Sequence, residues 1–266
     1  MVQTRINLNS DNQASTSFFK SCAPGALIVF LLLLASKVIA QDADSILTRY
    51  FEVVSKGDAR RWQNLKSNYI ESISSFSDRM LNGSTPDFKE MKVTQSKLYR
   101  VWPDLFRLDT FEDSVLVGSM FSAHKKRLMV MGNMPPIELS PGPYDDVVEF
   151  MPLTIQTVLK KGKHPKFIGV REIEGNNYLE VEIITKVLRW YLYFNENTYH
   201  LAYWNNSPDG DKSILTRVFN YKEIDGLMFN MSEYKIKNGV MFFWQEIKVL
   251  EIDKEIDERV FEYQPR

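Results

Sequence analysis

The spacing of apolar residues changes along the chain from a helical period to the alternation of strands. Between residues 42 and 54, apolar side chains recur every three or four positions, at Ile46, Leu47, Tyr50, Phe51 and Val54. This spacing predicts an amphipathic helix. Asp42 or Asp44 is expected to cap the start of this helix, and Gly57 to end it.

The next segments are mixed, and then strands dominate. Residues 59–80 fit either a helical face or an alternating strand, and we favour a short helical turn followed by a strand from about 68 to 78. Further strands are expected at residues 93–102, 106–110, 115–121 and 127–131.

A Pro-rich segment interrupts the strands at residues 134–144. Its sequence, MPPIELSPGPY, excludes a helix or a central strand and predicts a loop. Asp145 and Asp146 are then expected to cap a second helix that runs to about Lys160 and ends at Gly162. We interpret this pair of carboxylates as a helix cap rather than a catalytic pair.

The last hundred residues predict a series of β-hairpins. The expected strands are residues 167–173, 178–185, 187–194, 199–205, 216–224, 227–237 and 240–252. Asp225-Gly226 and Asn238-Gly239 separate the last three strands. These dipeptides strongly indicate hairpins, because both central residues of the turn must adopt positive φ.

The first forty residues have the pattern of an export signal. Residues 23–35 form an uncharged apolar run that is shorter than the ~20 residues of a membrane-spanning helix. Lys20 precedes the run, and Val38 and Ala40 fit cleavage after Ala40. We therefore expect residues 1–40 to be a cleaved signal peptide and residues 41–266 to be a single domain, with an uncleaved membrane anchor as the alternative.

Charge and residue content exclude several classes of function. The 266 residues carry a formal net charge of -1, without the basic excess typical of nucleic-acid-binding proteins. The single cysteine, Cys22, cannot form an intramolecular disulfide or a cysteine-based metal site. His124, His164 and His200 lack metal-ligand spacing, and no nucleotide-binding or nucleophile motif is present. We therefore expect no enzyme activity, no cofactor and no metal.

Aromatic residues point to an extensive apolar interior. The chain contains 17 Phe, 12 Tyr and 5 Trp. In residues 188–194, one strand face is apolar and the other carries Arg189, Tyr191 and Tyr193, while residues 241–244 are aromatic on both faces. Such strands need cover on both sides. The pattern is compatible with a solid core or with a curved sheet around a cavity for an apolar ligand.

Five segments, in order, resemble motifs of the periplasmic lipoprotein carriers, the LolA-like proteins of outer-membrane lipoprotein sorting. Residues 99–108, YRVWPDLFRL, are similar to their aromatic-basic-Pro-Asp-x-Phe-Arg strand, and residues 113–119 to the strand that follows. Residues 193–201 and 220–229 resemble two of their hairpins, and residues 249–265 their C-terminal segment. Together these segments extend the resemblance over roughly residues 42–266.

The resemblance implies an α+β fold: an unclosed, half-open antiparallel β-barrel with helices covering the concave mouth. It also implies a non-enzymatic periplasmic carrier that binds lipid or lipoprotein acyl chains for transport towards the outer membrane, with inner- or outer-membrane transport components as partners. The chain departs from the family pattern at Trp102, where the carriers have Arg, at residues 122–127, and at Asn230, where they have Pro. These departures concern lid gating and cargo more than the fold.

The expected cavity would be lined by one face of each strand. Its candidate ligand-binding residues are Phe106, Leu108, Trp190, Leu192, Phe194, Phe242 and Trp244. The first helix and the helix at residues 146–160 would form a lid. Burial of an acyl chain supplies ~0.8 kcal/mol per CH₂.

Two other functions are compatible with the residues. One is a structural or partner-binding cell-envelope protein with a filled core, for which the Pro-rich loop at residues 134–144 would be the contact surface. The other is a hydrolase with a site assembled from distant residues, which ranks last because no nucleophile and base are recognisable.

Overall fold

The computed structural model describes residues 42–77, 91–123, 126–140, 150–162 and 164–263. These residues belong to one compact unit, residues 42–266. The expected signal peptide lies outside the described residues, as do Asp145 and Asp146 themselves. The second helix, α5 (Met151–Lys161), begins at Met151, and the extended Phe150 occupies its cap position without a side-chain hydrogen bond. The expected helix start near residue 146 and the expected cap by this carboxylate pair are therefore wrong. None of the described helices combines the length and the apolar character that crossing a membrane requires.

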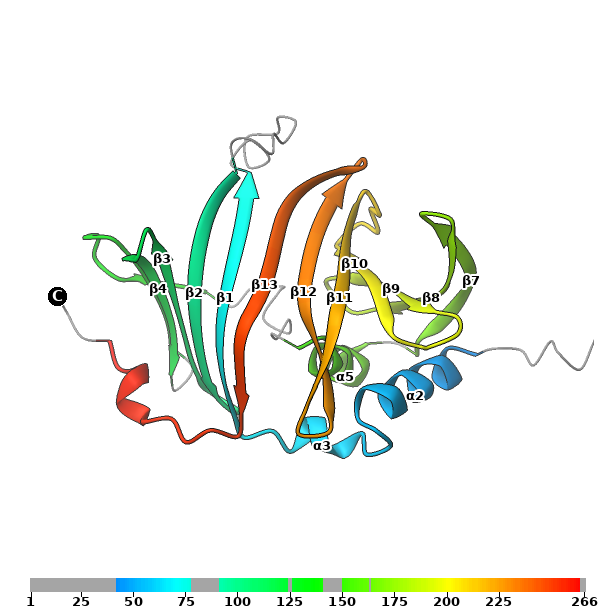
Figure 1. Ribbon diagram of the computed structural model, residues 1–266, viewed down its shortest axis with the longest axis horizontal. Helices are drawn as coiled ribbons and strands as arrows, with labels where there is room; N and C mark the ends of the chain where they lie inside the picture. The colour runs from blue at the N-terminus through cyan, green and yellow to red at the C-terminus, as the bar shows by residue number, and fades with distance from the viewer. Residues whose placement is uncertain (1–41, 78–90, 124–125, 141–149, 163, 264–266) are drawn as a thin grey trace, which may run out of the picture. The chain divides into compact units, whose positions relative to one another are not determined.

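Thirteen strands of the described residues form one antiparallel sheet (Figure 1). They are β1 (Ser67–Ser77), β2 (Met91–Val101), β3 (Leu105–Glu112), β4 (Val115–Ala123), β5 (Lys126–Met131), β6 (Ile137–Glu138), β7 (Lys166–Ile173), β8 (Asn176–Ile184), β9 (Arg189–Asn195), β10 (Leu201–Ser207), β11 (Ile214–Ile224), β12 (Leu227–Lys237) and β13 (Val240–Ile252). The strand order is β6-β5-β4-β3-β2-β1-β13-β12-β11-β10-β9-β8-β7. Because β6 and β7 occupy the two ends of this order, the sheet is not closed into a barrel, which confirms the expected open α+β fold.

Local sequence signals account for most element boundaries. The side chain of Asp42 caps α2 (Ala43–Val54) by accepting a hydrogen bond from the Ser45 backbone N–H. The ambiguous segment folds as the four-residue helix α3 (Arg60–Gln63) followed by β1, as favoured. Asp225, Gly226, Asn238 and Gly239 all have positive φ, so both predicted hairpin turns are present.

Several boundaries differ by a few residues from the sequence expectation, and two of the differences have a local cause. The strand expected from residue 199 begins at Leu201, because Tyr199 has φ 57° and its N–H bonds back to the Asn195 carbonyl in the preceding turn. The Pro-rich segment contains the two-residue strand β6, which pairs with β5 at the edge of the sheet. Pro135 and Pro136 precede β6, where their missing N–H groups interrupt no ladder.

The helices cover the β8–β12 half of the sheet. α2 and α5 (Met151–Lys161) bury one apolar side each, and the side chains of Ile46, Tyr50, Val54, Ile155 and Val158 are at most 1% exposed. The ring centroids of Tyr50 and Phe194 lie 5.1 Å apart, and those of Trp62 and Phe229 4.8 Å apart. Large aromatic rings therefore join the helices to the sheet.

The opposite face of the same half holds a smaller aromatic cluster. Its buried members are Tyr178, Tyr191, Tyr193 and Tyr203. Cationic side chains cover the rings: Arg171 lies over Tyr193, Lys212 over Tyr191 and Arg217 over Tyr203. Both faces of this half are thus covered, as the aromatic strands require.

Replacement of Trp62 tests the packing of the helices against the sheet. Trp62 is 1% exposed, packs against Phe150 and Phe229, and donates from Nε1 to the Val54 carbonyl. We expect Trp62→Ala to lower the free energy of unfolding by about 3–5 kcal/mol. Val187→Ala, at an exposed position, is expected to change it by less than about 0.5 kcal/mol. Urea unfolding measures the free energy of unfolding of both variants. Equal effects would contradict the assignment of Trp62 to the core between helices and sheet.

Candidate functional site

The helices define the two faces of the sheet. We call the face on which α2 and α5 pack the helix-side face, and the other the outer face. Leu192 lies on the helix-side face, and cross-strand partners share a face, so the register extends this assignment from strand to strand.

An apolar row crosses the helix-side face away from the helices. Each member is the register partner of the next, on β13, β1, β2, β3, β4, β5 and β6 in turn: Leu250, Ile70, Leu98, Leu108, Met120, Met129 and Ile137. Leu250, Ile70 and Leu98 adjoin the main core, and Leu108, Met120 and Met129 are half-buried. Ile137, at the sheet edge, is exposed. We call these seven residues the apolar row.

Polar side chains border the apolar row on one side. Ser72, Ser96 and Thr110 are register partners on β1, β2 and β3. Gln245 donates from Nε2 to Ser72 Oγ at 3.1 Å, and the hydroxyls of Ser74 and Thr94 lie 2.9 Å apart. These two contacts pair Gln245 with Ser72 and Ser74 with Thr94, so hydrocarbon and hydrogen-bonding surfaces lie next to each other on one face.

On the other side, a cation and aromatic rings border the row. The guanidinium carbon of Arg100 lies 4.9 Å from the centroid of the Phe106 ring and 5.7 Å from that of Trp102. Asn68, the register partner of Arg100, is completely buried, and its amide atoms have no hydrogen-bond partner among the described residues. Trp102, at the position where the resembled carriers have Arg, lies at this border because its ring contacts the Arg100 guanidinium.

Glu233 is an ionisable group on the helix-side face, paired in register with Gln245. Desolvation raises the pKa of the Glu233 carboxyl, and the positive charge of Lys235 offsets part of that rise. Lys235 itself lies over the rings of Phe243 and Trp204. The face thus places a carboxyl group and an ammonium among aromatic rings.

The seven candidate residues that the sequence suggested fall into three groups in the structure. Leu108 belongs to the apolar row, Phe106 lies beside the row, and both are half-buried. Trp190, Leu192 and Phe194 share the helix-side face but are at most 1% exposed within the core beneath the helices. Trp244 pairs with Ser75 and Tyr234 on the outer face, and Phe242 lies at a register shift between β12 and β13.

Sequence reasoning missed most of the apolar row. Leu98 and Met120 lie in strands of mixed composition, and Met129 lies in a strand where apolar residues occupy both faces. Only the strand register aligns them with Leu108, so no local pattern identifies them.

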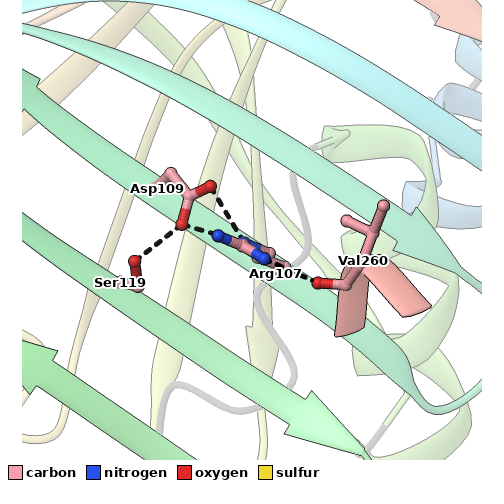
Figure 2. Close-up of polar contacts among 4 residues, drawn as sticks. All are labelled: Arg107, Asp109, Ser119 and Val260. Carbon is pink, nitrogen blue, oxygen red and sulfur yellow. Dashed lines mark hydrogen bonds and ion pairs between the residues drawn. The ribbon is translucent and has the colours of Figure 1, made fainter. Parts of the chain in front are cut away.

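The outer face holds the C-terminal segment through a charged network (Figure 2). Arg107 Nε donates to both carboxylate oxygens of Asp109 at 2.9 Å, and Ser119 Oγ donates to Asp109 at 2.7 Å. Arg107 Nη1 also donates to the Val260 carbonyl at 2.8 Å, in the short helix η2 (Glu258–Phe261). The arginine of the Pro-Asp-Leu-Phe-Arg motif therefore attaches the end of the chain to the sheet.

Two cavities adjoin the C-terminal segment on β3–β5. Their volumes are about 550 and 630 Å³, and both are lined by Phe121, Glu262 and Tyr263. None of the seven candidate residues lines either cavity.

Within the described part of the chain, no three His, Cys, Asp or Glu side chains gather as a metal site requires. Burial lowers the pKa of His200, whose ring packs against Tyr221 with centroids 4.7 Å apart. His124 lies outside the described residues.

The charged network predicts how firmly the C-terminal segment is held. Asp109→Asn keeps the shape of the side chain but removes the charge that orients Arg107. We expect exchange of the backbone amides at residues 258–262 to accelerate by about tenfold, because a hydrogen bond to a charged group contributes ~1.5 kcal/mol or more. Hydrogen–deuterium exchange measures this, with the exposed Asp113→Asn as the control. Unchanged exchange in Asp109→Asn would contradict the attachment.

The raised pKa of Glu233 predicts a pH dependence. The folded state binds the Glu233 proton more tightly than the unfolded chain does, so ionisation of Glu233 costs stability as the pH rises above its unfolded pKa of ~4.3. Glu233→Gln should therefore increase the free energy of unfolding at pH 7, and the gain should shrink towards pH 4. Denaturant unfolding at both values measures it; a gain that does not depend on pH would show that the charge is not responsible.

Comparison with known proteins identifies the fold. No protein-family model and no curated protein sequence matches the chain. Among solved structures, a LolA superfamily protein from Nitrosomonas europaea matches with a TM-score of 0.56 and 14% identity, over 84% of this chain and 99% of that one. A DUF1329 family protein from Desulfovibrio piger matches with a TM-score of 0.58 and 10% identity, over 82% and 95% of the two chains.

A third structure is a domain described as a putative outer membrane lipoprotein-sorting protein, from Vibrio parahaemolyticus. It matches with a TM-score of 0.53 and 10% identity, over 74% of this chain and 89% of that domain. At these identities the likeness concerns the fold alone. The fold of this protein is LolA-like, as the sequence motifs indicated.

Proposed function

We propose that this protein is a non-enzymatic periplasmic carrier that binds the acyl chains of a lipid or lipoprotein along the apolar row, for transport towards the outer membrane. The apolar row is the observation that carries the proposal. Seven aliphatic side chains in register form a continuous hydrocarbon surface on the face where helices cover the neighbouring strands.

The dimensions of the row suit an acyl chain. Neighbouring strands lie ~4.8 Å apart, so seven strands span about 29 Å along the sheet. One leaflet of a bilayer has a hydrocarbon thickness of ~15 Å, half that of the full core. The row is therefore longer than the space that one acyl chain occupies in a leaflet. Because each buried CH₂ contributes ~0.8 kcal/mol, partial burial of one chain already supports useful binding.

The polar borders suit an amphiphile rather than a plain hydrocarbon. The hydroxyls of Ser72, Ser74 and Thr94 and the amide of Gln245 lie on the same face as the row. An ester or amide linkage next to an acyl chain could exchange hydrogen bonds with these groups while the chain lies on the row.

Two further lines of support concern location and family. The apolar run at residues 23–35 is the expected export signal, which supports a periplasmic location. Two of the structural neighbours are described as a LolA superfamily protein and a lipoprotein-sorting domain, which supports lipoprotein transport and membrane transport components as partners.

The alternative is a structural or partner-binding cell-envelope protein with a filled core. One observation favours it: Trp190, Leu192 and Phe194, three of the seven candidate residues, are completely packed beneath the helices and leave no room for a ligand. For the carrier, the packing of these three residues confines any ligand to the part of the sheet that the apolar row crosses.

Adjacent residues of β5 provide a matched test of the proposal. Met129 belongs to the row, and Leu128 pairs with Phe121 on the outer face; both are half-buried. We expect Met129→Asp to weaken the binding of a fluorescent fatty acid by at least about tenfold, because a carboxylate would interrupt the hydrocarbon surface. Leu128→Asp should leave the affinity unchanged.

The result is interpretable only for folded variants, which circular dichroism and thermal unfolding verify. Equal affinities of the two variants would contradict binding on the row. Native mass spectrometry of the exported protein, purified without detergent, would in addition identify any lipid that it retains. A bare mass and no fatty-acid binding would favour the filled-core alternative.

A further inference from the structure

Exposed apolar side chains gather at one end of β4–β6. Among the described residues, eight large apolar side chains are exposed, and four of them lie in this region: Val115, Met131, Met134 and Ile137. Val115 is 64% exposed and Met134 49% exposed. Scattered exposed apolar residues are ordinary, but a cluster of them indicates an interaction surface.

Strand pairing brings these residues together. Gly118 pairs with Met131, and the Gly132 N–H donates to the Val117 carbonyl at 3.0 Å, so the end of β5 lies beside the start of β4. The Met134 N–H then donates to the Met131 carbonyl at 2.9 Å and turns the chain towards β6. The segment from Met131 to Glu138, which we call the β5–β6 hairpin, is exposed throughout.

The chemistry of the hairpin tip favours a lipid surface over a protein. Residues 131–137 read MGNMPPI and contain no charged side chain. They also contain none of the Trp, Tyr or Arg residues that usually anchor protein interfaces. The nearby charges include Glu112, Asp113 and Glu138, which are acidic and would not attract an anionic surface. A neutral hydrocarbon surface is the partner that this composition suits.

The hairpin is also continuous with the apolar row. Ile137 belongs to the hairpin and pairs with Met129, which pairs with Met120. Aliphatic surface therefore runs without interruption from the exposed hairpin along the helix-side face to Leu250. One end of the row opens where apolar side chains project from the protein.

We infer that the β5–β6 hairpin docks on the surface of a phospholipid bilayer, where its apolar side chains enter the interfacial region. Docking brings the open end of the apolar row to the membrane, so that an acyl chain passes between bilayer and protein across the β6 edge. The transfer step rests on the proposed carrier function, whereas docking itself does not.

Flotation with phosphatidylcholine vesicles tests docking. We expect the wild-type protein to float with the vesicles and to remain bound at high salt, because the contact is apolar. Met134→Asp and Val115→Asp should each lower the bound fraction by about tenfold, since a carboxylate opposes insertion. Val187→Asp, at an equally exposed position between β8 and β9, is the matched control and should bind as the wild type does.

The outcomes separate docking from acyl binding. Met134→Asp should keep the wild-type affinity for a fluorescent fatty acid in solution but extract it from vesicles about tenfold more slowly. Equal vesicle binding by Met134→Asp, Val187→Asp and the wild type would overturn docking, as would binding that high salt abolishes. Hairpin-dependent vesicle binding without any fatty-acid affinity would leave docking in place and overturn the carrier function.

Discussion

The pairing of β1 with β13 holds the two halves of the sheet together and sets which side chains face the helices. In the described sheet, every other pair of neighbouring strands is consecutive in the chain, whereas β1 and β13 come from its two ends. Their pairing connects the β2–β6 half of the sheet to the β7–β12 half. A slip of one residue in this pairing would move every side chain of β1 to the opposite face.

The bulge in this pairing determines which residues of β13 face the helices. The register shifts between Glu71 and Ser72, so that Lys248 has no direct partner. Ile247 and Leu250 are three residues apart and would lie on opposite faces of a regular strand. The extra residue places both on the helix-side face, against Ser72 and Ile70, and leaves the charged Lys248 exposed.

The two halves of the sheet use their faces differently. In the β8–β12 half, helices fill the helix-side face and a tyrosine cluster under cationic side chains fills the outer face. In the β2–β5 half, the helix-side face carries the apolar row, and the outer face receives the C-terminal segment through Arg107. At the edges, β6 is only two residues long, and a register shift at Gly169, with φ 145°, interrupts β7, both of which oppose pairing with another chain.

Neighbouring residues in the chain specify the local structure. Asp225-Gly226 and Asn238-Gly239 specify their turns, Asp42 specifies the start of α2, and alternation identifies most strands, because these features depend on neighbours within a few residues. Motif order also indicated the LolA-like fold. Contacts between distant segments instead determine which strands the helices cover and why Trp190 and Phe194 belong to the core. They also determine how Leu98, Leu108, Met120 and Met129 align. Those features depend on the register between strands, which is set by long-range packing and by bulges that no local pattern encodes.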